Sequence, residues 1–182
     1  MVRMDDNNSL ISEGGEWSKA AQSQVETKHL KVTASASNAK IRPGERIRLI
    51  LDIDLKPGMH VYAPGVEGYI PVDWKVTDSP AFQPAPAIYP PSKKLRLEAI
   101  QETVDVYDGR FTLQRETIVG AQAKVDPVVK EGGQLVIEGT LRYQACDDRM
   151  CYLPQTVPLK WTLQYEPHDR TRVPAELQRR VR

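Results

Sequence analysis

Hydrophobic residues alternate with polar ones along much of this chain, which is the pattern of half-buried β-strands. In the longest run, residues 47–55, every second residue is apolar. Further runs of this kind lie at 30–36, 59–62, 70–76, 104–106, 111–119, 135–143 and 157–165. Turns rich in Pro and Gly separate the runs, and no long helical pattern or internal repeat is present. This organisation predicts an all-β fold, an immunoglobulin-like antiparallel β-sandwich.

The apolar members of these runs should face each other in the core of the sandwich. The expected core residues are Leu49, Leu51, Ile53, Val72, Trp74, Leu113, Ile137, Leu141, Leu159 and Trp161. The Asp108-Gly109 pair predicts a hairpin between 104–106 and 111–119. The proline-rich stretch 80–91 predicts an extended loop along a sheet edge, because proline cannot donate a hydrogen bond to a central ladder.

The length of 182 residues suits one domain, which we expect over residues 25–165. We expect residues 1–24 to be disordered or extended, and 166–182 to form a tail or a short helix. The net charge is +1, so nothing indicates a nucleic-acid partner. No stretch approaches the roughly 18 apolar residues of a membrane span, and no signal peptide is visible at the start.

The two cysteines of the chain, Cys146 and Cys151, are separated by four residues and lie between the runs 135–143 and 157–165. If these runs form a hairpin, the two side chains face each other across it, at a spacing of about 4.5–5.5 Å that suits a disulfide. The bridge could be a redox couple or a structural staple. So small a ring adds only about 2 kcal/mol of stability, which favours the redox interpretation.

The residues between the cysteines bear on their reactivity, because the thiolate is the reactive species. Continued alternation from Tyr143 places Cys146 on the solvent face. Asp147 and Asp148 disfavour a thiolate at Cys146, whereas Arg149 favours one. The loop therefore looks like a disulfide that another protein's thiolate attacks.

The motif Tyr143-Gln144-Ala145-Cys146, followed by Cys151-Tyr152-Leu153-Pro154, resembles the cysteine motif of the amino-terminal periplasmic domain of the thiol:disulfide interchange protein DsbD. Residues 55–62 and 107–113 resemble other segments of this protein-disulfide reductase family, over about residues 25–165. The resemblance implies an immunoglobulin-like sandwich in the periplasm or another extracytoplasmic space. It also implies thiol–disulfide exchange without a cofactor, with thioredoxin-like proteins or a DsbD-type membrane or thioredoxin domain as partners.

The resemblance also implies roles for single residues. Cys151 would exchange with the partner, and Cys146 would resolve the mixed disulfide. Aromatic and polar residues expected to line the site are His60, Tyr62, Tyr143 and Tyr152, together with Asp147, Asp148 and Arg149 of the loop. The loop has four residues where the best-known relative has five. The family's aromatic cap loop is replaced by residues 97–102, in which Ile100 could serve as an apolar lid.

Two other interpretations remain open. The domain could be a non-catalytic interaction module whose disulfide is purely structural. Alternatively, Cys146, Met150 and Cys151 could bind Cu(I), which prefers soft sulfur ligands. Some DsbD relatives are linked with copper tolerance.

Overall fold

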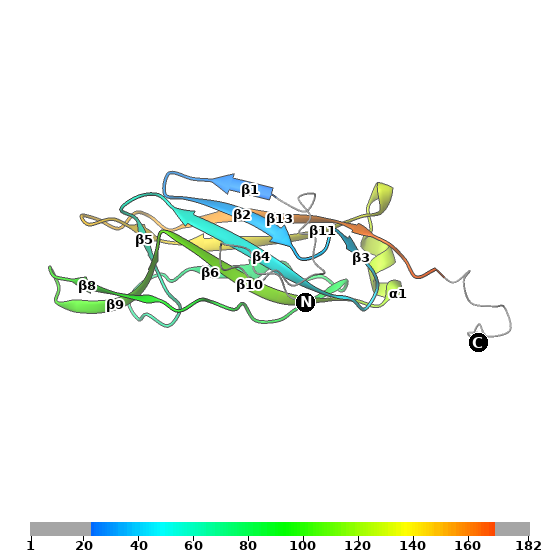
Figure 1. Ribbon diagram of the computed structural model, residues 1–182, viewed down its shortest axis with the longest axis horizontal. Helices are drawn as coiled ribbons and strands as arrows, with labels where there is room; N and C mark the ends of the chain where they lie inside the picture. The colour runs from blue at the N-terminus through cyan, green and yellow to red at the C-terminus, as the bar shows by residue number, and fades with distance from the viewer. Residues whose placement is uncertain (1–22, 170–182) are drawn as a thin grey trace, which may run out of the picture.

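The structure, a computed structural model, describes residues 23–169 and consists almost entirely of β-strands (Figure 1). Most of the two terminal segments for which predictions were made, 1–24 and 166–182, lies outside this range. Sheet A has the strand order β1 (Ser23–Glu26), β2 (Leu30–Ala36), β4 (Arg46–Leu55), β10 (Arg110–Val119) and β7 (Phe82–Pro84). Sheet B has the order β3 (Lys40–Ile41), β13 (Gln155–Tyr165), β11 (Gln134–Tyr143) and β6 (Asp73–Val76). Sheet C has the order β12 (Ala145–Cys146), β5 (His60–Tyr62), β9 (Glu102–Asp108) and β8 (Lys93–Leu97).

Helical structure within residues 23–169 is limited to short segments between β10 and β11. These are α1 (Gln122–Val125) and two 3-10 turns, Asp126–Val128 and Glu131–Gly133. The remaining connections are turns and loops, so the fold is the all-β sandwich that the alternation predicted.

The main core lies between sheets A and B, and every predicted core residue is buried in it. Trp74 of β6 stacks on Trp161 of β13 with ring centroids 5.8 Å apart. The Trp161 indole N–H donates to the carbonyl oxygen of Ser35 on β2 at 3.0 Å, which ties sheet B to sheet A. The guanidinium of Arg115 lies over the Trp74 ring, 4.9 Å from its centroid. The core prediction is therefore confirmed.

The predicted hairpin at Asp108-Gly109 is wrong. β9 pairs with β5 and β8 in sheet C, whereas β10 pairs with β4 and β7 in sheet A. The chain crosses between sheets at Gly109, which has φ +60° and whose carbonyl oxygen accepts a hydrogen bond from the Leu55 N–H at 2.8 Å. An Asp-Gly pair favours a tight turn, but it does not determine which strands pair on either side.

The proline-rich stretch lies at an edge of sheet A, as predicted. Its strand β7 pairs with β10, and the chain then continues along the same strand to a bridge between Ile88 and Gln114. No strand pairs with the outer side of β7 in the described part of the chain, so its prolines interrupt no ladder.

Sheet C extends from one end of the sandwich, where β8 and β9 project in Figure 1. One face of this sheet contributes to the main core through Val61, Tyr107 and Ala145. The opposite face carries a second, smaller cluster of buried side chains: Tyr62, Val104, Val106 and Cys146. The sheet therefore holds one cysteine on a surface separate from the main core.

Candidate functional site: the cysteine loop and the outer face of sheet C

The cysteine loop is the tip of the β11–β13 hairpin, turned from sheet B toward sheet C. The two long strands pair as far as Tyr143 and Gln155. Beyond Tyr143 the chain leaves sheet B, and β12 pairs with β5 instead. Cys151 faces Cys146 in an isolated antiparallel bridge, and the two form a disulfide. The disulfide inferred from the spacing is thus present.

The two sulfur atoms have very different surroundings. Cys146 is only 1% exposed, whereas Cys151 is exposed to solvent. The prediction that Cys146 faces solvent is wrong, because β12 joins a different sheet and the alternation of β11 does not continue through Gln144. An attacking thiolate must approach along the S–S axis from an open side, and Cys151 is the cysteine that offers one.

Tyr62 contacts both sulfur atoms. Its hydroxyl lies 3.4 Å from Sγ of Cys146 and 3.4 Å from Sγ of Cys151. Since a disulfide has no S–H, the hydroxyl is the donor in both contacts. Burial, together with the charge of Glu102, raises the pKa of Tyr62, so the hydroxyl keeps its proton at neutral pH. Tyr62 can therefore stabilise negative charge that develops on sulfur.

An apolar cover surrounds Tyr62 and Cys146 on the outer face of sheet C. The Tyr69 ring stacks on the Tyr62 ring at 4.3 Å, and its hydroxyl donates to the Glu102 carboxylate at 2.9 Å. Val66, Leu95 and Leu97 pack against the same cluster. Sequence reasoning did not identify this cover, although the alternation of Val104 and Val106 indicates an apolar face on this strand.

Asp147 organises the loop between the cysteines. One carboxylate oxygen accepts hydrogen bonds from the Arg149 and Met150 N–H groups, both at 2.8 Å, and the other accepts from the Tyr152 hydroxyl at 2.7 Å. These hydrogen bonds, that of Tyr152 first, lower the pKa of Asp147 to about 2. Asp148 and Arg149 are exposed. Asp147 thus keeps its negative charge beside the disulfide over the whole physiological pH range.

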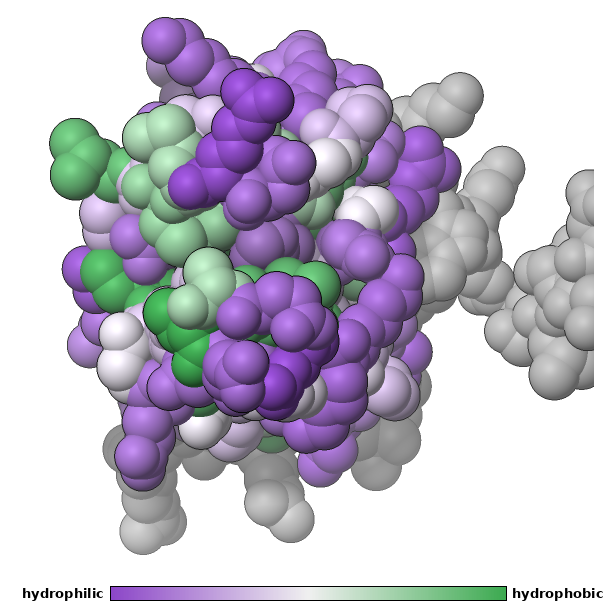
Figure 2. All heavy atoms as spheres, turned by 90° about the vertical axis from the view of Figure 1, so that its left-hand side faces the viewer, coloured by the Kyte–Doolittle hydropathy of each residue, from purple (hydrophilic) through white to green (hydrophobic). Residues whose placement is uncertain are grey.

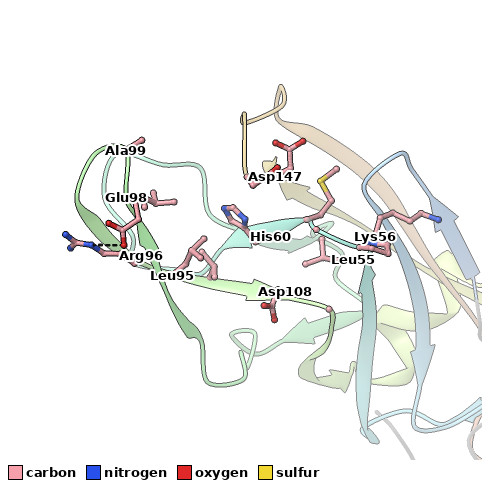
Figure 3. A pocket seen from close by; sticks show the side chains of 16 residues that line it. Leu55, Lys56, His60, Leu95, Arg96, Glu98, Ala99, Asp108 and Asp147 are labelled. Atoms are coloured by element: carbon pink, nitrogen blue, oxygen red, sulfur yellow. Dashed lines mark ion pairs between the residues drawn. The ribbon is translucent and has the colours of Figure 1, made fainter.

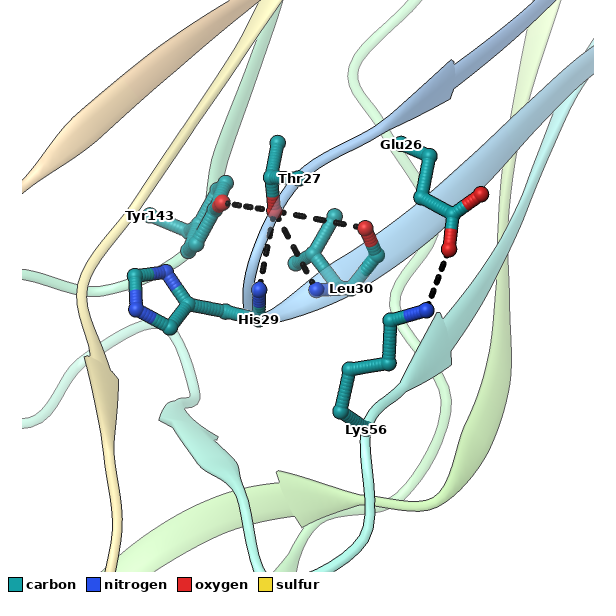
Figure 4. Close-up of polar contacts among 6 residues, drawn as sticks. All are labelled: Glu26, Thr27, His29, Leu30, Lys56 and Tyr143. Carbon is teal, nitrogen blue, oxygen red and sulfur yellow. Dashed lines mark hydrogen bonds and ion pairs between the residues drawn. The ribbon is translucent and has the colours of Figure 1, made fainter.

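Tyr143 lies on the other side of the hairpin, in the main core. Its hydroxyl is 2.8 Å from the Thr27 hydroxyl (Figure 4). The same hydroxyl donates to the Gln155 side-chain oxygen at 3.0 Å. The Thr27 hydroxyl oxygen also accepts hydrogen bonds from the N–H groups of His29 and Leu30, both at 3.2 Å. Tyr143 therefore anchors the base of the cysteine hairpin to the β1–β2 turn rather than lining the sulfur site.

A cavity of about 1030 Å³ opens beside the cysteine loop, between the β4–β5 turn and the β8–β9 hairpin (Figure 3). Its walls include Met59, Leu95, Leu97 and Val106. Ile100 does not line it: its side chain sits on the turn between β8 and β9 and is 56% exposed. The apolar residues that this hairpin places next to the site are thus Leu95 and Leu97 of β8 and Val104 and Val106 of β9, and not Ile100.

His60 projects into the same cavity from β5 (Figure 3). The side chain is buried, its ring meets the Tyr62 ring edge to face at 5.7 Å, and burial lowers its pKa. The structure therefore brings His60, Tyr62, Asp147 and Tyr152 together around the cysteines.

Residues 26–161 match the family described as "Thiol:disulfide interchange protein DsbD, N-terminal". The chain belongs to this family. The match covers the cysteine loop, sheet C and nearly all of sheets A and B. Membership of this family supports the interpretation of the chain as a thiol–disulfide exchange domain. No curated protein sequence matches the chain.

The fold of this DsbD N-terminal family member is also seen in a solved structure, "Crystal structure of the N-terminal periplasmic domain of ScsB from Proteus mirabilis". The two share 16% sequence identity at a TM-score of 0.53. The similarity covers 81% of this chain and 52% of the other, so this chain spans about half the length of that protein chain.

Two further properties concern the described part of the chain. None of the helices between residues 23 and 169 has the length and hydrophobicity of a membrane span. Within that range, no three His, Cys, Asp or Glu side chains gather into a group that could hold a metal ion. Met150, the third ligand of the copper interpretation, is 54% exposed in the cysteine loop.

Proposed function

We propose that the Cys146–Cys151 disulfide is the redox centre through which this domain relays electrons between thioredoxin-like proteins. The observation that carries the proposal is the asymmetry of the pair, an exposed Cys151 and a buried Cys146. A structural staple has no need of one open sulfur. Membership of the DsbD N-terminal family supports the same assignment.

The asymmetry supports one order of bond changes. A partner thiolate attacks Sγ of Cys151, a new disulfide forms between the two proteins, and the Cys146–Cys151 bond breaks. Cys146 leaves as a thiolate carrying the electron pair, next to the Tyr62 hydroxyl. In the reverse step the Cys146 thiolate attacks Cys151, the intramolecular disulfide closes, and the partner leaves as a thiolate.

Exposed apolar side chains next to Cys151 support the proposal that the partners of this domain are proteins. Leu153 is 86% exposed and Met150 54% exposed, and both lie within two residues of Cys151. Figure 2, which views the end of the molecule with β8 and β9, shows hydrophobic atoms in separate patches between hydrophilic ones. We propose that Met150 and Leu153 contact the thioredoxin-like partner around its own cysteines, because they are the large, exposed apolar side chains that flank Cys151.

We propose a periplasmic or other extracytoplasmic location. Disulfides persist in oxidising compartments, and the similar ScsB domain is described as periplasmic. Fractionation of cells that express the full-length gene tests this. Recovery of the native protein in the periplasmic fraction supports the proposal, and recovery only in the cytosol with both thiols reduced contradicts it.

The exchange role is tested by trapping. Cys146→Ala should accumulate a mixed disulfide with an oxidised thioredoxin-like protein, because the Cys151 thiolate attacks the partner's disulfide and no Cys146 thiol is present to attack Cys151 and release the reduced partner. Cys151→Ala should trap little, because Cys146 is buried. Both variants should stay folded, since so small a ring contributes at most about 2 kcal/mol. Equal trapping by both variants contradicts the assignment, and trapping by neither favours the structural staple.

A further inference from the structure

His60 occupies a position opposite Cys146. The two residues are paired in the β5–β12 ladder, and on its other side His60 is paired with Asp108 of β9. Directly paired residues of antiparallel strands project to the same face with their Cβ atoms about 4.5–5.5 Å apart. His60 is therefore the imidazole that shares the outer face of sheet C with the buried sulfur.

One nitrogen of His60 has no partner. The residue is only 9% exposed, and its Nε2 atom is buried and makes no hydrogen bond within residues 23–169. Buried polar atoms are nearly always paired, and this unpaired nitrogen belongs to the residue directly opposite Cys146 in the ladder, so it is free to accept a proton on that face. In the oxidised protein Cys146 has no proton to offer. In the reduced protein its thiol has one.

The charges around His60 suit a group that is neutral at rest and can become positive. Burial lowers the pKa of His60, whereas the carboxylates of Asp108 and Asp147 act in the opposite direction. Asp108 is also ion-paired with Lys93 of β8. The other charged residues at the walls of the cavity are Lys56, Arg96, Glu98 and Asp148. Lys56 pairs with Glu26 and Arg96 with Glu98.

We propose that His60 is the proton acceptor for the Cys146 thiol. The inference deepens the proposed function and rests on it. When a mixed disulfide joins Cys151 to a partner, Nε2 of His60 takes the proton of the Cys146 thiol. The resulting Cys146 thiolate attacks Sγ of Cys151, the Cys146–Cys151 bond forms, and the bond to the partner breaks. The partner sulfur leaves with the electron pair, and Asp108 and Asp147 stabilise the imidazolium.

A proton moves in the opposite direction when the disulfide is opened. Cys146 then leaves as a thiolate into a buried site beside the Asp147 carboxylate, where a negative charge is unfavourable. His60, protonated again from solvent, gives a proton to this sulfur, and Tyr62 donates a hydrogen bond to it. Asp147 alone could not serve, because its pKa of about 2 leaves it without a proton.

The test is the reaction of the reduced domain with dithiobis-nitrobenzoate, which releases coloured thionitrobenzoate in two steps. In the first, the Cys151 thiolate forms a mixed disulfide, at a rate that depends on reagent concentration. In the second, Cys146 closes the disulfide at a rate that does not. The wild-type second step should have a pH inflection below the ordinary histidine value of about 6.5.

His60→Gln should move that inflection to the ordinary thiol range, at about 8.5 or above. Its second step should slow by about tenfold or more at pH 6.5, with the first step unchanged. His29→Gln is the matched control: His29 is 4% exposed and has an unpaired Nδ1, but it packs against Tyr143 and Tyr152 instead of facing Cys146. It should keep the inflection.

Asp108→Asn provides a second test that retains His60. Removing a carboxylate that raises the pKa of His60 should shift the inflection to lower pH. If His60→Gln does not fold, an unchanged inflection in Asp108→Asn overturns the inference. If His60→Gln folds and keeps the wild-type inflection, the inference is also overturned, while the exchange function stands. Absence of any second step in the wild-type protein would instead contradict the proposed function.

Discussion

Replacing Tyr62 by phenylalanine removes a single oxygen atom, the one that lies 3.4 Å from each sulfur of the disulfide. The ring stays, and with it the stack on Tyr69 at 4.3 Å and the packing against Val104 and Val106. The fold should therefore be unaffected. What changes is the hydrogen bond available to the Cys146 thiolate.

The size of the effect follows from the chemistry of that hydrogen bond. Hydrogen bonds to charged groups contribute about 1.5–3 kcal/mol, and the lower end applies because sulfur is a weak acceptor. About 1.4 kcal/mol corresponds to one pKa unit, so the Cys146 thiol should become less acidic by about one unit. In the transition state of disulfide opening the leaving sulfur carries about half of its final charge, so the rate should fall about threefold.

Two assays measure these quantities. The ultraviolet absorbance of the thiolate, followed against pH in a Cys151→Ala background, gives the Cys146 thiol pKa with and without Tyr62→Phe. Opening of the oxidised protein by dithiothreitol gives the rate. Tyr107→Phe is the matched control, because Tyr107 is a buried tyrosine of the same sheet whose hydroxyl donates to the Pro90 carbonyl oxygen at 2.8 Å.

The expected outcome is specific to Tyr62. An unchanged Cys146 thiol pKa together with an unchanged opening rate in Tyr62→Phe refutes the role given to this hydroxyl. An equal effect of Tyr107→Phe would show that the change acts through the packing of sheet C and not through sulfur.

Other changes probe the loop, the partner surface and the sandwich. The pKa of Asp147 is lowered to about 2, so its charge stabilises the fold above about pH 4, and this contribution is lost as the pH falls toward 2. In thermal melts, the stability advantage of wild type over Asp147→Asn should therefore shrink between about pH 4 and about pH 2. A difference that stays constant over this range contradicts the prediction. Leu153→Ser should slow exchange with a thioredoxin-like protein severalfold and leave reduction by dithiothreitol unchanged; equal slowing of both reactions argues against a docking role. A Cβ at Gly139 would lie 2.5 Å from the Lys75 carbonyl oxygen, so Gly139→Ala should lower the free energy of unfolding in urea by about 1–3 kcal/mol, and no loss would show that β6 shifts freely.

The long strands could be predicted because their information is local. In β4, residues 46–55, every side chain that the alternation predicted to be buried is buried. The same holds for the alternating apolar positions of β11 and β13. Burial on one face of a long strand leaves a periodic pattern that needs no knowledge of the partner strand. The tryptophans that stack at the centre of the core were found in this way.

Sheet C could not be predicted in the same way, because two of its strands are too short to show a period. β12 has two residues and β5 has three. Their pairing depends on residues far apart in the chain, and it is this pairing that buries Cys146 and places His60 opposite it. The burial of Cys146 was therefore predicted wrongly. Tyr62 was a candidate through the family resemblance, but its contact with both sulfurs depends on the three-dimensional pairing.

The midpoint potential of the Cys146–Cys151 couple, determined by thiol trapping in glutathione or dithiothreitol buffers, tests the central claim most directly. An exchange domain needs a disulfide that opens and closes at physiological potentials. The account predicts a midpoint above about −300 mV, in the range where redox-active protein disulfides exchange with the glutathione pool. A midpoint well below −300 mV, typical of structural disulfides, would contradict it and identify the bridge as a staple of the hairpin.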